Sequence, residues 1–235
     1  MEKEKRRLVV FTGTVGSGKT TQMKLLAEQL RKENVKAKIV VLKTNHLFAH
    51  CLTLVLEYIL FGGRKQAFVI RELIDKRSMI FRKLFKLWLV LDAISISLKF
   101  LWRVKLPLKL GYAVLVEEFL PAIVTDYVYI CRTVDLPSRT SNRIIRFVSM
   151  ILTSAGPMKN VFLDAQSNVL QLRWERRGTP SEKPAYLRAQ REMLLRCSKM
   201  LATDGFLYID TSTKTTNETQ TCIQTHLGIE AGWVI

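Results

Sequence analysis

At positions 13–20 the chain reads Gly13-Thr14-Val15-Gly16-Ser17-Gly18-Lys19-Thr20, which has the G-x-x-x-x-G-K-[ST] spacing of a phosphate-binding loop. Apolar residues 8–11 predict a buried strand before it, and periodic apolar residues predict a helix over 20–33 after it. This order suits phosphate binding, because glycines let backbone N–H groups surround phosphate oxygens and the helix N-terminus adds partial positive charge. Lys19 is expected to reach the β and γ phosphates, and Thr20 to hold Mg²⁺ through its hydroxyl. The loop therefore predicts a protein that uses a nucleoside triphosphate.

The composition is that of a globular chain rather than a disordered one. Of the 235 residues, 48% are hydrophobic and 24% are charged, so residues 1–235 are expected to form a single α/β domain. The four cysteines, Cys51, Cys131, Cys197 and Cys222, lie far apart without metal or redox spacing, and this favours reduced thiols and a cytoplasmic location. Six of the first seven residues are charged and lead directly into the first strand, so no cleavable signal is expected.

The net charge of +17 is large for a protein of this length. It indicates either a surface for nucleic acid or anionic lipid, or an adaptation of the host without a specific partner. Twelve Lys and Arg residues against three acids fall in the helical region 64–110. Its most apolar part, 84–102, is interrupted by Lys86, Asp92 and Lys99, which argues against a membrane span. A core helix that covers the sheet is the favoured interpretation, and a surface that docks membrane or nucleic acid is the alternative.

Further apolar runs alternate with helical patterns along the chain. The predicted strands cover 38–42, 112–116, 161–164 and 206–210, and the predicted helices cover 47–60, 64–110, 123–132, 141–152, 181–200 and 217–227. Buried strands joined by helices imply right-handed crossovers and a parallel sheet. The expected fold class is therefore α/β, with a five-stranded parallel sheet flanked by helices.

The carboxyl ends of these strands are where ligands of such sheets lie. Lys43 follows the second strand and is either a phosphate ligand or an ordinary solvated lysine. Glu117 and Glu118 end the third strand, and since side chains alternate along a strand, only one of them can face the site. We expect Glu117 to do so and either to bind Mg²⁺ through water or to order the acceptor; a solvated glutamate pair is the alternative. His46 and His50 are four residues apart, but without a third ligand no metal site is expected there.

The segment 172–184 carries Arg173, Arg176 and Arg177 and ends in a hinge that contains Gly178 and Pro180. Such an arginine cluster is typical of a lid that folds over transferring phosphates, and a solvated basic helix end is the alternative. Arg173 and Arg177 are four residues apart and share one helix face, so both are expected to meet the transferring phosphoryl group.

Taken in this order, the parts resemble the thymidylate kinase group of nucleoside-monophosphate kinases over nearly the whole chain. The resemblance rests on the phosphate loop, Asp92, Val114-Leu115-Val116, Thr125-Asp126-Tyr127, Leu163-Asp164, Arg173 to Gly178, and Asp210. It implies a three-layer P-loop kinase fold, the use of ATP and Mg²⁺, and an acceptor bound between the helices that follow strands two and three. It also implies an ATP site that includes Thr21 after the phosphate loop and Asp210, since the loop from Asp210 to Thr213 would contact adenine.

The acceptor half departs from the family pattern. Glu118 stands where the family has the arginine of Asp-Arg-Tyr or Asp-Arg-Phe, and Ala93 stands where an arginine often follows the aspartate. The Pro-Gly-Gly segment after strand two is replaced by 43–46. Thymidylate is therefore only the default acceptor. A hydroxyl acceptor such as a nucleoside, with Glu117 as general base, and a P-loop ATPase that associates with nucleic acid or membrane both stay open, as does a homodimer.

Overall fold

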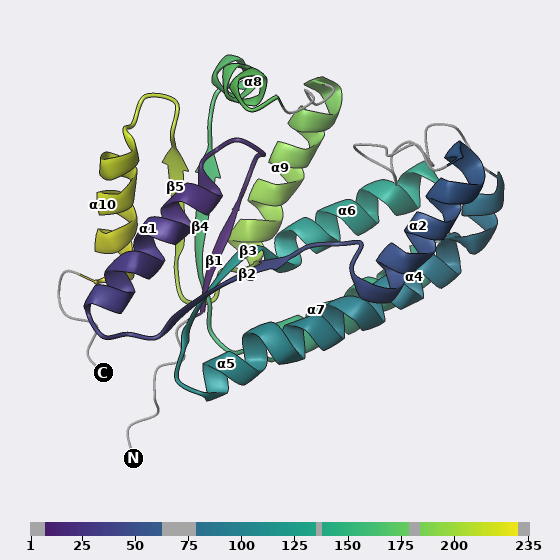
Figure 1. Ribbon diagram of the computed structural model, residues 1–235, viewed down its shortest axis with the longest axis horizontal. Coiled ribbons are helices and arrows are strands. Elements are labelled where there is room, and N and C mark those ends of the chain that lie inside the picture. Colours follow the sequence, from purple (N-terminus) through teal and green to yellow (C-terminus); the bar gives the residue numbers. More distant parts are fainter. Residues whose placement is uncertain (1–7, 63–78, 135–137, 179–183, 230–235) are drawn as a thin grey trace.

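A five-stranded, all-parallel sheet forms the centre of the molecule in the computed structural model, which describes residues 8–62, 79–134, 138–178 and 184–229 (Figure 1). The strands are β1 Leu8–Gly13, β2 Ala37–Leu42, β3 Ala113–Glu118, β4 Lys159–Asp164 and β5 Phe206–Asp210. Their order in the sheet is β2-β3-β1-β4-β5. The expected α/β class with five parallel strands is confirmed.

The central position of β1 explains its continuous apolar sequence. All six of its residues are buried, and it pairs with β3 (Val10 opposite Val116) on one side and with β4 (Phe11 opposite Val161) on the other. A parallel strand covered on both faces has no solvent side, so it carries no polar alternation. The phosphate loop consequently starts at the middle of the sheet's carboxyl edge.

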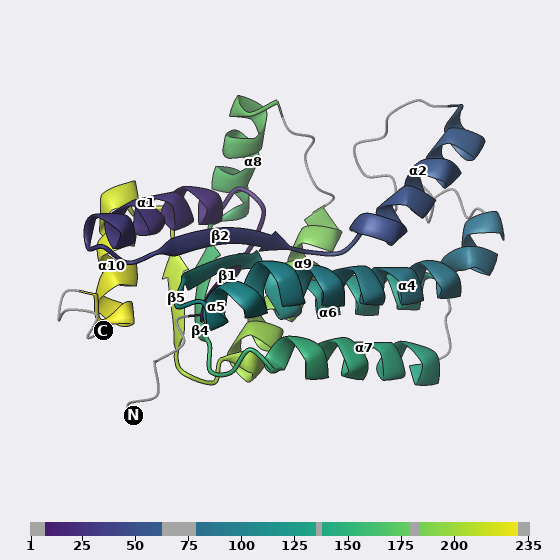
Figure 2. The same ribbon diagram turned by 60° about the horizontal axis from the view of Figure 1, so that its bottom comes forward.

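Helices cover both faces of the sheet (Figure 2). Their bounds are α1 Lys19–Lys32, α2 Leu47–Phe61, α4 Met79–Phe100, α5 Leu106–Lys109, α6 Phe119–Thr133, α7 Ser138–Thr153, α8 Ser167–Arg176, α9 Pro184–Leu201 and α10 Thr216–Leu227. On one face, α1 and α10 pack on Phe11 and Leu163. On the other, α4, α6 and α7 pack on Val10 and Val116 and form the larger core.

Several helices begin or end at other residues than the sequence predicts. The helix expected over 123–132 already begins at Phe119, directly after β3, because Pro121 is tolerated in a first turn where N–H groups have no intrahelical partner. The helical region up to 110 is not one regular helix: a π-helical turn, η1 Leu101–Lys105, separates α4 from α5. Pro107 lies just after this turn and has no N–H to continue the regular ladder.

Parts of two predictions lie outside the described residues: the first part of the basic region (64–78) and the lid residues 179–183. Residues 135–137, between two of the predicted helices, lie outside them as well. The described part of the segment expected to form the lid is the end of a regular helix, α8, followed by Arg177 and Gly178. Within the described ranges, no helix is both long enough and apolar enough to cross a membrane.

Candidate active site

The phosphate loop connects β1 to α1 and requires glycine at particular positions. Gly13 has φ +132°, and a Cβ there would lie 1.8 Å from the backbone oxygen of Leu163 on β4. At Gly16 (φ +87°) a Cβ would lie 2.8 Å from Nε1 of Trp174. Both positions are thus closed to any side chain, because the loop lies tightly between β4 and α8. The Ser17 hydroxyl donates to the carbonyl of Thr14 (2.8 Å) and fixes the turn before α1.

Lys19, the first residue of α1, points into its own loop. Its Nζ donates to the carbonyl oxygens of Gly13 (3.0 Å) and Thr14 (2.9 Å), and the residue is only 5% exposed. Carbonyl dipoles balance the buried ammonium group. An incoming phosphate offers stronger, charge-assisted acceptors to the same group, so the loop is arranged for an anion.

Thr20 and Glu117 meet at the edge of the loop. The Thr20 hydroxyl donates to both carboxylate oxygens of Glu117, at 3.1 and 3.0 Å, although the residues lie on α1 and β3. In the described part of the chain, no group of three or more His, Cys, Asp or Glu residues is placed to hold a metal ion. A hydroxyl and one carboxylate are nevertheless the sparse oxygen set that fits Mg²⁺, which keeps waters and takes further ligands from phosphates.

Helix α8 packs directly on the phosphate loop. Trp174 is buried, and its Nε1 donates to the carbonyl of Val15 at 3.0 Å. Arg173 donates to the Gly16 carbonyl (3.1 Å) and to the carbonyl and hydroxyl oxygens of Thr211 (2.8 and 3.1 Å). Burial, together with nearby Arg177, lowers the pKa of the Arg173 guanidinium from its ordinary value. The arginine thus ties the phosphate loop to the loop after β5.

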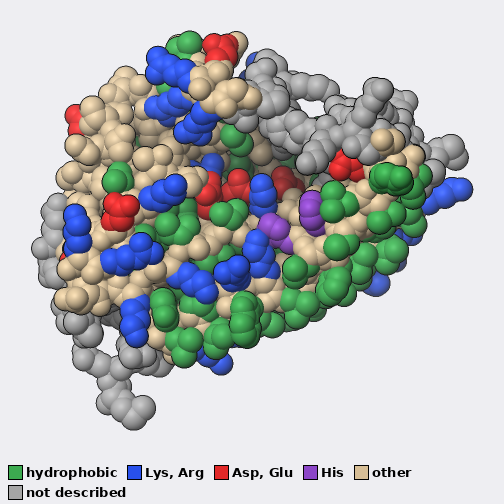
Figure 3. Space-filling model, viewed as in Figure 1, with side chains coloured by type: hydrophobic (Ala, Val, Ile, Leu, Met, Phe, Trp, Pro, Cys, Tyr) green, Lys and Arg blue, Asp and Glu red, His purple; other side chains and the backbone are tan. Residues whose placement is uncertain are grey.

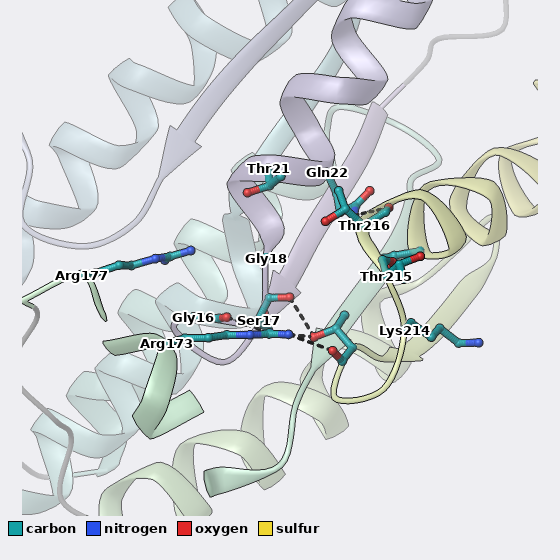
Figure 4. A pocket seen from close by; sticks show the side chains of 12 residues that line it. Gly16, Ser17, Gly18, Thr21, Gln22, Arg173, Arg177, Lys214, Thr215 and Thr216 are labelled. Carbon is teal, nitrogen blue, oxygen red and sulfur yellow. Dashed lines mark hydrogen bonds between the residues drawn. The ribbon is translucent and has the colours of Figure 1, made fainter. Parts of the chain in front are cut away.

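A polar pocket lies between these three segments (Figure 4). Both Arg173 and Arg177 line it, as their spacing on one helix face predicts, whereas Arg176 is exposed and is not among its lining residues. The remaining lining residues come from the phosphate loop and α1 and from the loop and helix after β5: Gly16, Ser17, Gly18, Thr21, Gln22, Thr211, Lys214, Thr215, Thr216 and Thr219. The pocket therefore joins the phosphate loop to the segment that the resemblance assigns to adenine.

Asp210, expected at the adenine site, does not line this pocket. It is exposed, and one of its carboxylate oxygens accepts from the backbone N–H (2.8 Å) and the hydroxyl (2.5 Å) of Ser212. These hydrogen bonds lower the pKa of Asp210 below its usual range. The structure places Asp210 as a residue that shapes the loop after β5, while Thr211 and the segment from Lys214 to Thr216 reach the pocket.

Two residues that support the loop were missed by the sequence reasoning. Arg191 on α9 contacts the carboxylate of Asp164 at 3.0 Å and the carbonyl of Ala165 at 2.7 Å. The same carboxylate accepts from the Thr14 hydroxyl at 3.0 Å. Trp174 is the second missed residue. Neither contact has a local sequence signal, because each joins segments that are far apart in the chain.

The expected acceptor region centres on Asp92, a fully buried carboxylate on α4. Asp92 accepts from the backbone N–H of Asn45 (2.7 Å), with His46 N–H at 3.4 Å, and from the Tyr127 hydroxyl (2.9 Å). Burial raises its pKa to about 6, although these donors oppose the shift. Asp92 therefore joins the β2–α2 loop to α4 and α6. Next to it, Thr44 donates to Asp126 at 2.9 Å.

Cations gather on the β2 side of this region. Lys99 Nζ lies 2.7 Å from Nε2 of His46, and exposed Lys43 is close enough to affect both groups electrostatically. Burial, followed by Lys99, Lys43 and His50, lowers the pKa of His46 to about 4, so its neutral ring accepts from Lys99 at neutral pH. Burial, Arg103 and Lys43 also lower the pKa of Lys99. We call Lys43, His46 and Lys99 the positively charged rim of this region; its charge comes from the two lysines.

The backbone is strained where β3 ends. Glu118 has φ 75° and ψ −56°, and the following Phe119 has φ 46°. The values for Glu118 are those of a γ-turn with positive φ, and a non-glycine residue held there costs about 1–3 kcal/mol. The strain turns the chain sharply into α6 directly after Glu117. Such outliers gather at functional sites, and this one adjoins both the phosphate loop and the acceptor region.

Comparison with known proteins identifies the fold. No protein-family model matches the sequence, and no curated protein matches it. Among solved structures, 148 chains match. One of them is thymidylate kinase from Candida albicans, an enzyme described as having broad substrate specificity and a novel structural element. It is 14% identical, with a TM-score of 0.55, and the match covers 96% of this chain and 93% of that one. The chain thus has a thymidylate kinase-like fold.

Proposed function

We propose that this protein is an ATP-dependent nucleotide kinase that transfers a phosphoryl group to a nucleoside monophosphate. The contact between Thr20 and Glu117 carries the proposal, because it puts a hydroxyl and a carboxylate side by side at the mouth of a complete phosphate loop. Mg²⁺ held there would neutralise charge on the β and γ phosphates. Lys19, which now donates to loop carbonyls, would turn its ammonium group to the same phosphates.

Phosphoryl transfer depends on positioning and charge neutralisation more than on covalent chemistry. Arg173 is already bonded to the Gly16 carbonyl and to Thr211, so we assign it to holding the ATP site together. Arg177 lines the pocket, and no hydrogen bond or ion pair of its side chain is found within the described ranges. We therefore propose Arg177 as the arginine that stabilises charge on the transferring group.

A phosphate acceptor needs no catalytic base, since its second pKa is about 6 and it is largely ionised at neutral pH. It does need cations, and Glu118 stands where the family's arginine would bind it. Lys43 and Lys99 of the positively charged rim supply this charge, at the end of β2, which pairs with the end of β3. Thymidylate stays the default acceptor. Because Glu118 adds negative charge at the end of β3, a hydroxyl acceptor such as a nucleoside, with Glu117 as base, is the second candidate.

A coupled assay of ADP release across all ribo- and deoxynucleoside monophosphates and nucleosides tests this proposal. We expect turnover with at least one monophosphate, and an increase of KM for it of about tenfold or more in Lys43→Ala, because one phosphate contact is lost. Lys24→Ala, an exposed lysine on α1, is the matched control and should behave as the native protein. ADP release without any acceptor dependence would instead identify an ATPase. A cytoplasmic location and a homodimer stay predictions.

A further inference from the structure

Helix α4 is apolar on two opposite sides. Its inner side chains, which include Phe85, Trp88, Ile96 and Phe100, are fully buried in the larger core. Its outer side and the turns that follow expose large apolar side chains to between 38% and 69%. We call these residues the outer stripe: Leu87, Val90, Ile94, Leu98, Leu101, Trp102, Leu106 and Leu110. A helix that covers a sheet normally has a polar outer face, so this stripe needs an explanation.

The stripe is continuous rather than scattered. At about 100° per residue, the five members from Leu87 to Leu101 fall within an arc of about 80°, opposite the buried face. Trp102, the most exposed at 69%, extends the stripe into η1. Figure 3 shows these apolar side chains as a green band along the edge of the molecule formed by α4 and α5, with Lys and Arg side chains beside it. Contiguous exposed apolar surface of this kind marks an interaction site.

In the part of the chain that the structure describes, the exposed charged side chains of α4, η1, α5 and α7 are all cations. The sequence from Met79 to Lys109 contains seven Lys and Arg residues and one acid, and that acid is the fully buried Asp92. Lys83, Lys86, Arg103 and Lys109 are exposed. Helix α7, which packs against α4, adds three arginines and no acid: Arg139, Arg143 and Arg146. The surface therefore combines an apolar centre with a border of cations.

We propose that the outer stripe is a docking surface for membranes that contain anionic lipids. Apolar side chains would enter the boundary between headgroups and acyl chains, and the bordering cations would pair with lipid phosphates and carboxylates. An anionic membrane therefore matches both the apolar stripe and the cations that border it. This proposal is independent of the proposed function, since no residue of the phosphate loop or pocket takes part in it.

Charge argues against a second copy of the chain as the occupant, and the apolar centre argues against nucleic acid. A symmetric pair of copies would bring the same patch of each chain together and place the two borders of cations against each other. Nucleic acid would match the cations, but its phosphates would leave the central leucine, isoleucine and valine side chains without a partner, and Trp102 is the one aromatic member of the stripe that could stack on a base.

Co-sedimentation of the full chain with vesicles tests the proposal. We expect binding to phosphatidylcholine vesicles that contain phosphatidylserine, weaker binding at higher ionic strength, and little binding to phosphatidylcholine alone. Leu98→Glu with Leu101→Glu should lower the partition coefficient by about tenfold or more, since both side chains are exposed and the core is untouched. Lys86→Ala and Lys109→Ala should each lower it about fivefold. Met200→Glu is the matched control, because Met200 is an 83% exposed apolar residue on α9.

Tryptophan emission gives a second measurement that does not depend on a destabilising change. Of the tryptophans in the described ranges, Trp102 is exposed while Trp88 and Trp174 are buried, so vesicles should shift the emission of Trp102 to shorter wavelength. Trp102→Phe should still bind but lose this shift. The proposal is overturned by no binding to the anionic vesicles, or by an equal loss of binding in Met200→Glu. It is also overturned by a dimer that Leu98→Glu dissociates, or by tighter binding to RNA than to vesicles.

Discussion

Asp92→Asn should stabilise the fold at neutral pH, although it alters a fully buried group with three donors nearby. Burial raises the pKa of Asp92 from 3.8 to about 6. The ionised side chain is therefore less favourable in the folded chain than in the unfolded one. A difference of about two pKa units between the folded and the unfolded chain corresponds to about 3 kcal/mol. Above pH 6 the unfolding free energy is therefore lower by about this amount than it is when Asp92 is protonated in both states. Asparagine keeps an oxygen for the N–H of Asn45 and can donate to the Tyr127 hydroxyl oxygen, so the hydrogen bonds are largely preserved.

The sign of the pH dependence follows from the raised pKa. Between about pH 4 and pH 6 the unfolded chain loses the proton of Asp92 while the folded chain keeps it, so this group makes stability fall as pH rises. Urea denaturation from pH 4 to pH 8 should show that decline in the native chain and a smaller one in Asp92→Asn, with the variant up to about 3 kcal/mol more stable at pH 7. Asp204→Asn, an exposed carboxylate, is the control. Destabilisation of Asp92→Asn at pH 7 with an unchanged pH profile would show that the buried carboxylate does not lower stability.

Three other predictions concern the phosphate loop and its neighbours. Gly13→Ala should lower the unfolding free energy by more than about 3 kcal/mol or prevent folding, because its Cβ would lie 1.8 Å from the backbone oxygen of Leu163; a denaturant midpoint equal to that of the native chain would contradict this. Arg177→Ala should lower turnover about a hundredfold or more with nearly unchanged ATP affinity, whereas Arg176→Ala should lower turnover much less. Steady-state kinetics measures turnover and calorimetry measures ATP affinity. Equal losses in the two variants would mean that the arginines of this segment form only a general basic patch. Glu117→Gln should raise the Mg²⁺ concentration needed for half-maximal turnover about tenfold, and an unchanged Mg²⁺ titration would remove the residue from the metal site.

The order of strands and helices could be predicted because its signals are local. Each central strand is an apolar run, and the phosphate loop is a motif of eight residues between a strand and a helix. The contact between Thr20 and Glu117 could be anticipated in the same way, since a parallel sheet brings the end of β3 beside the loop after β1. Where a sequence feature and the sheet topology pointed to the same place, the structure agrees.

Contacts between distant segments could not be predicted. Nothing around Trp174 indicates that its indole N–H reaches the carbonyl of Val15, because that contact depends on how α8 packs on the loop. Arg173 was expected beside the transferring phosphate, yet Thr211, far along the chain, holds its guanidinium. The strain at Glu118 has no sequence signal either, since glutamate seldom adopts positive φ. The outer stripe was interpreted as core because the sequence shows apolar content but not which side of α4 is covered.

The most direct test of phosphoryl transfer is the Mg²⁺-dependent movement of label from radiolabelled ATP to a nucleoside monophosphate, compared between the native chain, Lys19→Ala and Lys24→Ala. Lys19 points into the phosphate loop, where we propose that it binds the phosphates, while Lys24 lies exposed on the same helix. We expect labelled nucleoside diphosphate from the native chain and from Lys24→Ala. Lys19→Ala should yield at least about a hundredfold less labelled product, with unchanged circular dichroism. Equal transfer by Lys19→Ala, or no labelled nucleotide from the native chain with any monophosphate, would contradict it.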